Sequence, residues 1–249
     1  MSDVISVSDV AVRFGPRQVF HHVSFSVHAG EVFVILGGSG CGKSTLLRML
    51  MGLLPPSEGH IEVLGRDMAH PDTALRIQVG VMFQMGALFG SMTLLENVML
   101  PLEMHTDLPE AARASVARTK LGLVGLGDAA ALMPAEISGG MAKRAAIARA
   151  LALDPPVLFL DEPSAGLDPS TSAGLDRLIL DLRRDLGITF VVVTHELASI
   201  LAIADRCIML DKTAQGVIAE GDPRTLGETS DNHTVRAFFR REAEGAGSA

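Results

Sequence analysis

The stretch Val32-Phe33-Val34-Ile35-Leu36-Gly37-Gly38-Ser39-Gly40-Cys41-Gly42-Lys43-Ser44-Thr45 decides the fold of this chain. Its first five residues are apolar and three of them are β-branched, which predicts a buried strand. A glycine-rich loop follows, and good helix formers continue from Thr45 to Met51. The order of strand, glycine loop and helix allows successive backbone N–H groups to surround an anion at a helix N-terminus.

The loop fits the pattern G-x-x-x-x-G-K-[ST], whose backbone cradles phosphates. Lys43 is predicted to reach the β- and γ-phosphates of a nucleotide, and the Ser44 hydroxyl to ligate Mg²⁺. The predicted phosphate site contains Gly37, Gly38, Ser39, Gly40, Cys41, Gly42, Lys43, Ser44 and Thr45. A plain glycine turn is the alternative, but both the spacing and the flanking elements favour a phosphate loop.

Composition and charge narrow the class of protein. The chain has 249 residues, of which 48% are hydrophobic and 20% charged, so it can bury a substantial core. It lacks Trp and Tyr and carries a net charge of −8, which argues against base stacking and phosphate neutralisation on a nucleic acid. Its two cysteines, Cys41 and Cys207, suggest no disulfide framework and fit a reducing cytosol.

No segment has the pattern of a membrane anchor. Met1-Ser2-Asp3-Val4 lacks the basic and apolar regions of a signal peptide, and no apolar run approaches the roughly 18 residues of a spanning helix. We therefore expect any work at a membrane to go through a partner. The small, polar tail at residues 242–249 is expected to fray.

Alternating apolar residues predict an antiparallel edge sheet, with strands at residues 5–14 and 23–27 joined across Gly15-Pro16-Arg17. Phe14 ends the first strand. An aromatic ring at this position either packs in the core or stacks on an adenine base.

A helical subdomain is predicted at residues 85–153, inserted into an α/β core of residues 1–84 and 154–241. Within it, Thr93 and Glu96 have the spacing of a capping box. The other predicted elements are strands at residues 61–63, 79–83, 157–160, 189–194, 208–210 and 216–219, and helices at residues 109–123, 142–153, 170–186 and 235–241.

Polar side chains directly follow four predicted strands: the phosphate loop, Gln84, the pair Asp161 and Glu162, and His195. Because ligands of mostly parallel sheets bind beyond the carboxyl ends of the strands, we expect these groups to converge on one nucleotide. Asp161 suits Mg²⁺, which prefers oxygen ligands, and we group it with Ser44 and Gln84 as a metal site. Glu162 is predicted to activate the attacking water, and His195 and Gln84 join it as catalytic residues. A solvated carboxylate pair and a structural histidine are the alternatives.

A second anion site is predicted where Ile137-Ser138-Gly139-Gly140-Met141 precedes a helix, because the first amides of a helix have no partners inside it. A glycine turn between helices would explain this motif if it stood alone. A chain with one copy of each half-site suggests that two copies face each other.

Together these motifs resemble the ATP-binding subunits of ABC transporters, over nearly the whole chain. The matching residues are Phe14, the Walker A loop at 37–45, the Q-loop residue Gln84, the signature Ser138-Gly139-Gly140, Walker B at 158–162, the D-loop Ser164-Ala165-Gly166-Leu167-Asp168 and the switch His195. The resemblance implies a P-loop NTPase fold and a head-to-tail homodimer that holds two ATP molecules between Walker A of one copy and the signature of the other. It also implies that Phe14 is an adenine platform and that Asp168 belongs to the nucleotide site.

A finer resemblance is to the ATPases of phospholipid-trafficking transporters of the Mla and Mce type. It is carried by residues 83–89, 132–136 and 137–146, including Met141 where most ABC ATPases have Gln. It implies phospholipid cargo, a transmembrane permease, a substrate-binding protein of the Mce class and a small STAS-domain partner. The chain would then work at the cytoplasmic face of the inner membrane, held there by the permease.

Two other functions remain open from the sequence. One is an ABC ATPase that serves another small solute, and the other is a soluble ABC ATPase that acts on a protein or ribosomal assembly. The acidic balance and the single nucleotide unit disfavour a ribosomal factor. The apolar stretch Gly86-Ala87-Leu88-Phe89 is expected either to dock the permease or to pack inside the helical subdomain.

Overall fold

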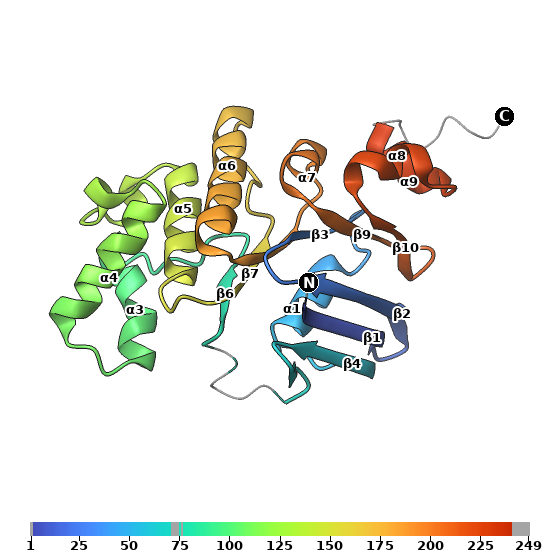
Figure 1. Cartoon of the computed structure of the whole chain (residues 1–249), viewed down its shortest axis with the longest axis horizontal. Coiled ribbons are helices and arrows are strands. Elements are labelled where there is room, and N and C mark those ends of the chain that lie inside the picture. Colours follow the sequence, from blue (N-terminus) through green and yellow to red (C-terminus); the bar gives the residue numbers. More distant parts are fainter. Residues whose placement is uncertain (1, 71–74, 76, 241–249) are drawn as a thin grey trace. The chain divides into compact units, whose positions relative to one another are not determined.

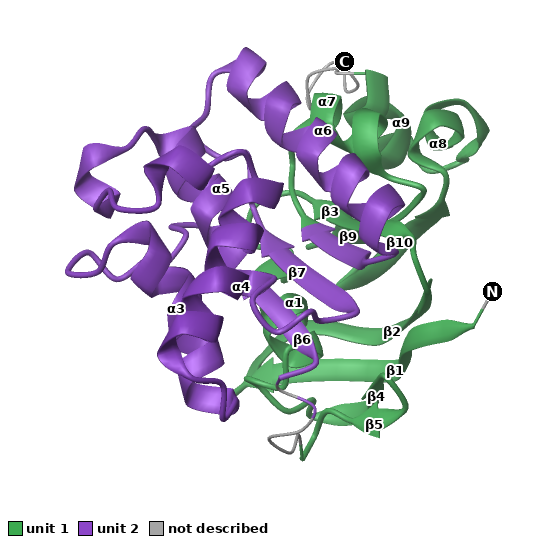
Figure 2. Cartoon of the chain, turned by 60° about the vertical axis from the view of Figure 1, so that its left-hand side comes forward, with its two compact units in different colours: residues 1–70, 193–249 green, residues 71–192 purple. Residues whose placement is uncertain are grey.

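The computed structural model describes residues 2–70, 75 and 77–240, which contain both strands and helices (Figure 1). The chain forms two compact units. Unit 1 contains residues 1–70 and 193–249, and unit 2 contains residues 71–192 (Figure 2). The expected α/β class is confirmed by this mixture of elements.

The predicted helical subdomain at residues 85–153 lies within unit 2, which also contains strands and a helix that the prediction gave to the core. The subdomain boundaries stay a prediction. The tail expected at residues 242–249, and Arg241 at the end of the expected last helix, lie outside the described residues.

Unit 1 begins with a four-stranded antiparallel sheet in the order β2-β1-β4-β5. Its strands are β1 (Asp3–Phe14), β2 (Arg17–His28), β4 (Glu58–Val63) and β5 (Arg66–Asp67). The predicted antiparallel pair is confirmed, but β2 begins at Arg17 and not at Val23. Asp9 and His22 both have a φ of 50°, and the strand register shifts around them. Such bulges interrupt the two-residue alternation on which the prediction depended.

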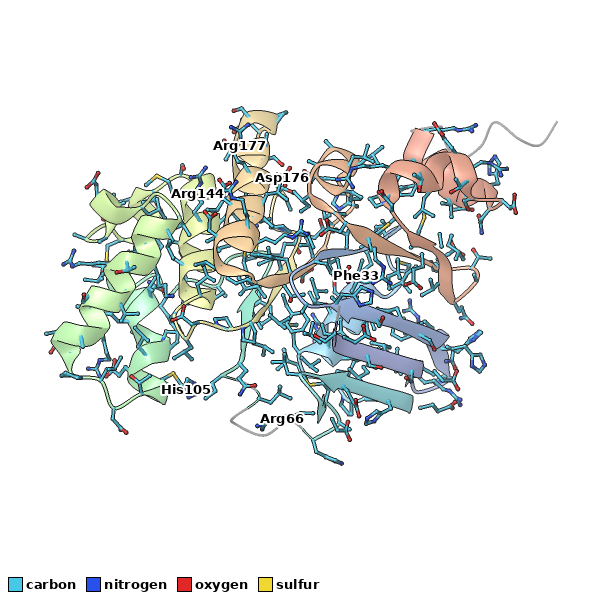
Figure 3. All side chains as sticks on the ribbon, in the orientation of Figure 1. Phe33, Arg66, His105, Arg144, Asp176 and Arg177 are labelled. Carbon is cyan, nitrogen blue, oxygen red and sulfur yellow. The ribbon has the colours of Figure 1, made fainter. Side chains whose placement is uncertain are left out.

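The central strands of unit 1 are β3 (Val32–Gly37), β9 (Arg206–Asp211) and β10 (Gly216–Gly221). All six residues of β3 are buried, as the sequence predicts. β3 pairs in parallel with β9, which pairs antiparallel with β10. Phe33, which Figure 3 labels, stacks on Phe25 with ring centroids 5.3 Å apart, and the guanidinium of Arg206 lies 5.5 Å from the Phe33 centroid. These contacts fix the strand from which the phosphate loop leaves.

The helices of unit 1 are α1 (Lys43–Leu50), α7 (Leu197–Ile203), α8 (Pro223–Thr229) and α9 (His233–Arg240). The sequence predicted α1 and α9. It missed α7 and α8, each of which has seven residues, because so short a segment barely displays the helical period.

The strands of unit 2 are β6 (Val79–Met82), β7 (Val157–Asp161) and β8 (Thr189–Val193), whose last residue belongs to unit 1. Their order is β8-β7-β6. β6 and β7 are parallel, with Val79 opposite Val157 and Met82 opposite Leu160. The predicted strands before Gln84 and before the carboxylate pair are therefore confirmed, and their carboxyl ends lie at the same edge.

The helices of unit 2 are α3 (Leu94–His105), α4 (Glu110–Leu123), α5 (Gly139–Ala150) and α6 (Pro169–Leu186). Figure 1 shows α3, α4 and α5 packed together. The predicted capping box is confirmed: Glu96 N donates to Thr93 Oγ1 over 3.2 Å, and Thr93 N donates to the Glu96 carboxylate over 2.7 Å. Such a cap stabilises a helix by about 1 kcal/mol. The side chain of Asp168 caps α6.

Candidate nucleotide-binding site

The phosphate loop of unit 1 has a backbone that only glycine adopts easily. Gly37 has a φ of 145°, and a Cβ there would lie 2.2 Å from the carbonyl oxygen of Leu210. Gly42 has a φ of 105°, and its Cβ would lie 2.8 Å from Phe20 Cδ1. Neither distance is compatible with a side chain. The glycines that suggested a phosphate loop are therefore required by the packing of the loop on β9 and β2.

Lys43 is the first residue of α1, and its side chain folds back over the loop. Its Nζ donates to the carbonyl oxygens of Gly37 over 2.8 Å and of Gly38 over 3.1 Å. The N-cap residue Gly42 has no side chain with which to satisfy the first amides of α1. A cation and several helix amides thus lie next to one another, which is the arrangement that binds phosphate groups.

A cavity of about 270 Å³ adjoins this loop within unit 1. It is lined by Phe14, Arg17, Val19, Gly40, Gly42, Lys43, Ser44 and Thr45. Phe14 is 52% exposed, so its ring is not part of the core and is accessible to a ligand. The cavity therefore has an aromatic wall at the end of β1 and phosphate-binding groups at the start of α1.

Cys41 is buried within the loop. Its side chain is 1% exposed and lies against Gly37. Burial raises the pKa of the thiol, although the positive charge of Lys43 opposes this effect. Cys41 and Cys207 are both buried free thiols.

His195 also lies in unit 1, directly after Thr194. The backbone N–H of Thr194 donates to the carbonyl oxygen of Ile35 over 3.4 Å, which attaches this segment to β3 two residues before the phosphate loop. The His195 side chain is exposed. The structure therefore brings His195, Phe14 and the phosphate loop into the same unit.

In unit 2, Asp161 ends β7 and Glu162 follows it with a φ of 47°. A non-glycine residue rarely adopts this left-handed conformation, and such strain is concentrated at functional sites. Both carboxylates are half-buried. Gln84 follows β6, two residues after its last position, and its side chain is exposed.

The signature motif lies at the start of α5. Ser138 is the N-cap, and its Oγ accepts a hydrogen bond from Met141 N over 3.3 Å. Ser138 and Gly139 are exposed, whereas Gly140 is buried, and a Cβ at Gly140 would lie 2.5 Å from Thr171 Cγ2. Close packing on α6 thus explains one glycine, and exposure leaves the other free to approach a ligand.

Asp168 is engaged with its own helix. Its carboxylate accepts hydrogen bonds from the hydroxyls and backbone amides of Ser170 and Thr171, at 2.5 to 3.1 Å. The hydrogen bond from the Ser170 hydroxyl, followed by that from Thr171, holds the pKa of Asp168 well below its usual range. The capping role is observed, and the nucleotide role stays a prediction.

Sequence reasoning missed Lys143. This residue of α5 is 8% exposed, and its Nζ donates to the carbonyl oxygens of Gln84 and Glu162. Burial lowers the pKa of Lys143, while the nearby carboxylates of Asp161 and Glu162 oppose that effect. A buried lysine five residues after Ser138 carries no local signal, because its partners are 59 and 19 positions away in the sequence.

Comparison with known proteins identifies the family. A family model described as "ABC transporter" matches residues 20–165. The chain belongs to the ABC transporter family. As a member of this family it binds and hydrolyses ATP, and the ABC ATPase fold expected from the sequence is confirmed.

Two relatives of the ABC transporter family match most of the chain. MlaF of Escherichia coli strain K12, named as an intermembrane phospholipid transport system ATP-binding protein, is 40% identical over 98% of this chain and 91% of its own. The protein mkl of Mycobacterium tuberculosis strain H37Rv, named as a probable ribonucleotide transport ATP-binding protein, is 41% identical over 94% of this chain and 66% of its own.

Two solved ABC structures share the fold. CbiO1 of Clostridium perfringens, part of an ABC transporter complex, superposes with a TM-score of 0.83 at 28% identity, covering 97% of both chains. The dimeric ATP-binding cassette MJ0796, bound to ADP and Pi, superposes with a TM-score of 0.77 at 31% identity, covering 88% of this chain and 98% of that one.

Proposed function

We propose that this ABC ATPase powers the movement of phospholipids between membranes through a separate permease. The observation that supports this cargo is the 40% identity, over nearly the whole chain, to a relative named for intermembrane phospholipid transport. The short motifs at residues 83–89 and 137–146, which resemble the same group of transporters, add support.

The similarity to mkl supports a second candidate cargo. The relative mkl is equally similar and is named for probable ribonucleotide transport, so another small solute is the alternative. The chain covers 91% of MlaF but 66% of mkl, and this difference favours the phospholipid cargo. Neither name supports the soluble, non-transport ATPase considered from the sequence.

In the proposed site, ATP lies along the cavity of unit 1. Phe14 stacks on the adenine, the amides at the start of α1 bind the phosphates, and the Lys43 ammonium exchanges its loop carbonyls for the β- and γ-phosphates. The exposed ring of Phe14 and the short contacts of Lys43 to Gly37 and Gly38 support these roles.

The residues proposed for Mg²⁺ fit its preference for oxygen ligands. Ser44 lines the cavity beside Lys43, and Asp161 and Gln84 carry a carboxylate and an amide at strand ends. When bound, Mg²⁺ neutralises charge on the β- and γ-phosphates. Ser44, Asp161 and Gln84 are the residues that would hold it.

For hydrolysis we assign Glu162 as the base that takes a proton from the attacking water. His195 would hydrogen-bond the γ-phosphate and orient that water, and Gln84 would complete the catalytic set. The strained backbone of Glu162 and its place directly after β7 support its role.

We further propose that two copies pair head to tail around two ATP molecules. Ser138, Gly139 and Gly140 of one copy would cover the ATP held by the phosphate loop of the other, with Asp168 nearby. The exposure of Ser138 and Gly139, and the dimeric state of the similar cassette MJ0796, support this arrangement.

The permease contact is proposed at the loop after β6. Several large apolar side chains of unit 2 are exposed there, on α3 and just after α3, among them Phe83, Met85, Phe89, Met104 and Leu108, and Met85 reaches 90%. Exposed apolar patches commonly mark protein contacts.

Among residues 2–70, 75 and 77–240, no helix has the length and hydropathy needed to cross a bilayer.

By this contact the permease would hold the chain at the cytoplasmic face of the inner membrane. An Mce-class substrate-binding protein and a STAS-domain protein are the further partners we propose, from the resemblance of the short motifs to Mla and Mce ATPases.

Reconstitution of the chain with its co-purifying permease in vesicles tests the cargo. We expect labelled phospholipid to move between donor and acceptor vesicles only with ATP and with Glu162 intact. ATP hydrolysis without lipid movement, but with uptake of a ribonucleotide, would replace the phospholipid proposal with the second cargo.

A further inference from the structure

Lys143 connects two loops of the proposed catalytic site. It lies on α5, immediately after the signature, and its ammonium is directed at backbone carbonyl oxygens. One carbonyl belongs to Gln84, and the other, at 3.4 Å from Nζ, belongs to Glu162. A single side chain therefore holds the peptide units that follow two of the three assigned catalytic residues, Gln84 and Glu162.

Helix α5 holds the loop after β6 at a second point. Arg149 donates to the carbonyl oxygen of Ala87 over 2.6 Å and to that of Gly86 over 3.1 Å. Between the two cations the loop lies close to the helix, because a Cβ on Gly86 would be 3.5 Å from Ala146 Cβ. Lys143 is thus the side chain of α5 that contacts both this loop and the Glu162 carbonyl.

The backbone of Glu162 needs such support. A φ of 47° costs a non-glycine residue roughly 1 to 3 kcal/mol, and it persists only when surrounding contacts hold it. The Glu162 carbonyl accepts hydrogen bonds from Ala165 N over 3.2 Å and from the Lys143 ammonium over 3.4 Å, and the second of these attaches it to α5. Removal of the ammonium would let the Glu162 peptide relax, which would displace the carboxylate without removing it.

We propose that Lys143 is a positioning residue for ATP hydrolysis. It fixes the Glu162 backbone relative to Gln84, so that the carboxylate meets the attacking water only when the loop after β6 is in place. This inference rests on the proposed role of Glu162 as the base. Lys143 itself does not touch the nucleotide in this scheme, so its loss should lower kcat and leave KM for ATP unchanged.

The test compares Lys143→Met with Lys143→Arg. We expect the Met variant to lower kcat by about 10- to 100-fold, since a misplacement of the order of 1 Å costs up to about 100-fold. The Arg variant should recover kcat to within about threefold, because a guanidinium also donates to two carbonyls. Lys120→Met is the matched control: Lys120 is 6% exposed on α4 and pairs with Asp154, and its loss should leave kcat unchanged.

Folding defects are separated by measuring Tm and the ATP affinity of each variant. If Lys143→Met and Lys120→Met lower Tm equally but only the first lowers kcat, the positioning role holds. A Lys143→Met variant with wild-type kcat overturns it, as does a rise in KM with no fall in kcat. If the Met variant does not fold, the Arg variant and Lys143→Gln are compared instead, and equal kcat for both overturns the proposal.

The Glu162→Gln background separates this inference from the assigned role of Glu162. If Lys143 acts through that carboxylate, adding Lys143→Met to Glu162→Gln should not reduce the residual turnover further. Independent, multiplicative losses would overturn the positioning role while leaving Glu162 as the base. Full activity of Glu162→Gln alone would instead overturn the proposed role of Glu162 as the base, on which this inference rests.

Discussion

Replacement of Asn97 tests how the loop after β6 is held. Asn97 lies on α3 and is fully buried. Its Oδ1 accepts from Phe89 N over 2.8 Å, and its Nδ2 donates to the carbonyl oxygens of Phe89, Met92 and Thr93 over 3.0 to 3.1 Å. Because an amide nitrogen has two hydrogens, these contacts amount to about three full hydrogen bonds, each contributing about 1 kcal/mol.

We therefore expect Asn97→Ala to lower the free energy of unfolding by about 3 kcal/mol, measured by urea denaturation. In a chain of this length that corresponds to a fall in Tm of about 6 to 12 °C. Asn232→Ala is the control, since the Asn232 side chain accepts one hydrogen bond, from Thr234 N. This substitution should lower the free energy of unfolding by about 1 kcal/mol. A loss below about 1 kcal/mol for Asn97→Ala would refute this account of the loop.

The Asn97→Asp variant adds a pH test with a defined sign. Its carboxylate would be buried facing three carbonyl oxygens, so the pKa of the introduced group should rise above its unfolded value. A group whose pKa is raised in the folded state stabilises the native state at low pH. That stabilisation is lost as the pH rises through the folded-state pKa. The loss in free energy of unfolding of Asn97→Asp, relative to the wild type, should therefore become smaller as the pH falls. A loss that does not change with pH would contradict the burial of the introduced carboxylate.

Three further predictions concern the site. Glu162→Gln should reduce turnover to a small residual rate, keep ATP affinity and yield a long-lived dimer on a sizing column; a fully active, monomeric variant would remove Glu162 from its role. Lys43→Ala should weaken ATP binding, and Ser138→Arg should block hydrolysis. Mixing the two inactive proteins should restore partial activity, and no recovery in proven mixed dimers would count against composite sites. Met85→Glu should keep Tm and basal hydrolysis but lose permease capture, whereas Leu53→Glu, a control in unit 1, should retain it.

The half-buried Leu88 gives a complementary test of the docking stretch. The sequence left open whether Gly86-Ala87-Leu88-Phe89 docks a partner or packs inside. Leu88→Glu should lower Tm if the interior contacts dominate, since a buried unpaired carboxylate costs several kcal/mol. A stable Leu88→Glu variant that still binds the permease would contradict docking at this stretch.

The sequence predicted those features that depend on neighbours in the chain. The Thr93 capping box and the strand-loop-helix order around Lys43 are both encoded by residues close together in the sequence, and the structure contains both. The start of β2 was wrong because a bulge at His22 exchanges the two faces of the strand, and nothing near His22 in the sequence marks it.

Contacts between distant segments could not be predicted in the same way. Whether Phe14 packs in the core or faces a ligand depends on strands that fold from elsewhere in the chain, and only the structure shows that the ring is half exposed. Lys143 is the stronger case, since a lysine in an amphipathic helix is ordinarily solvated. Its burial follows from where Gln84 and Glu162 place their carbonyls.

The loop after β6 is held almost entirely through its backbone. Lys143 and Arg149 of α5 bind its first carbonyls, and Asn97 of α3 binds its last amide and carbonyls. Because these contacts use no side chain of the loop, residues such as Met85 remain available to a partner. Substitution of exposed loop residues should therefore leave the position of the loop unchanged, while a change at Asn97 or Arg149 should move every loop residue at once. Met85→Leu should accordingly leave Tm unchanged, and Arg149→Met should lower it.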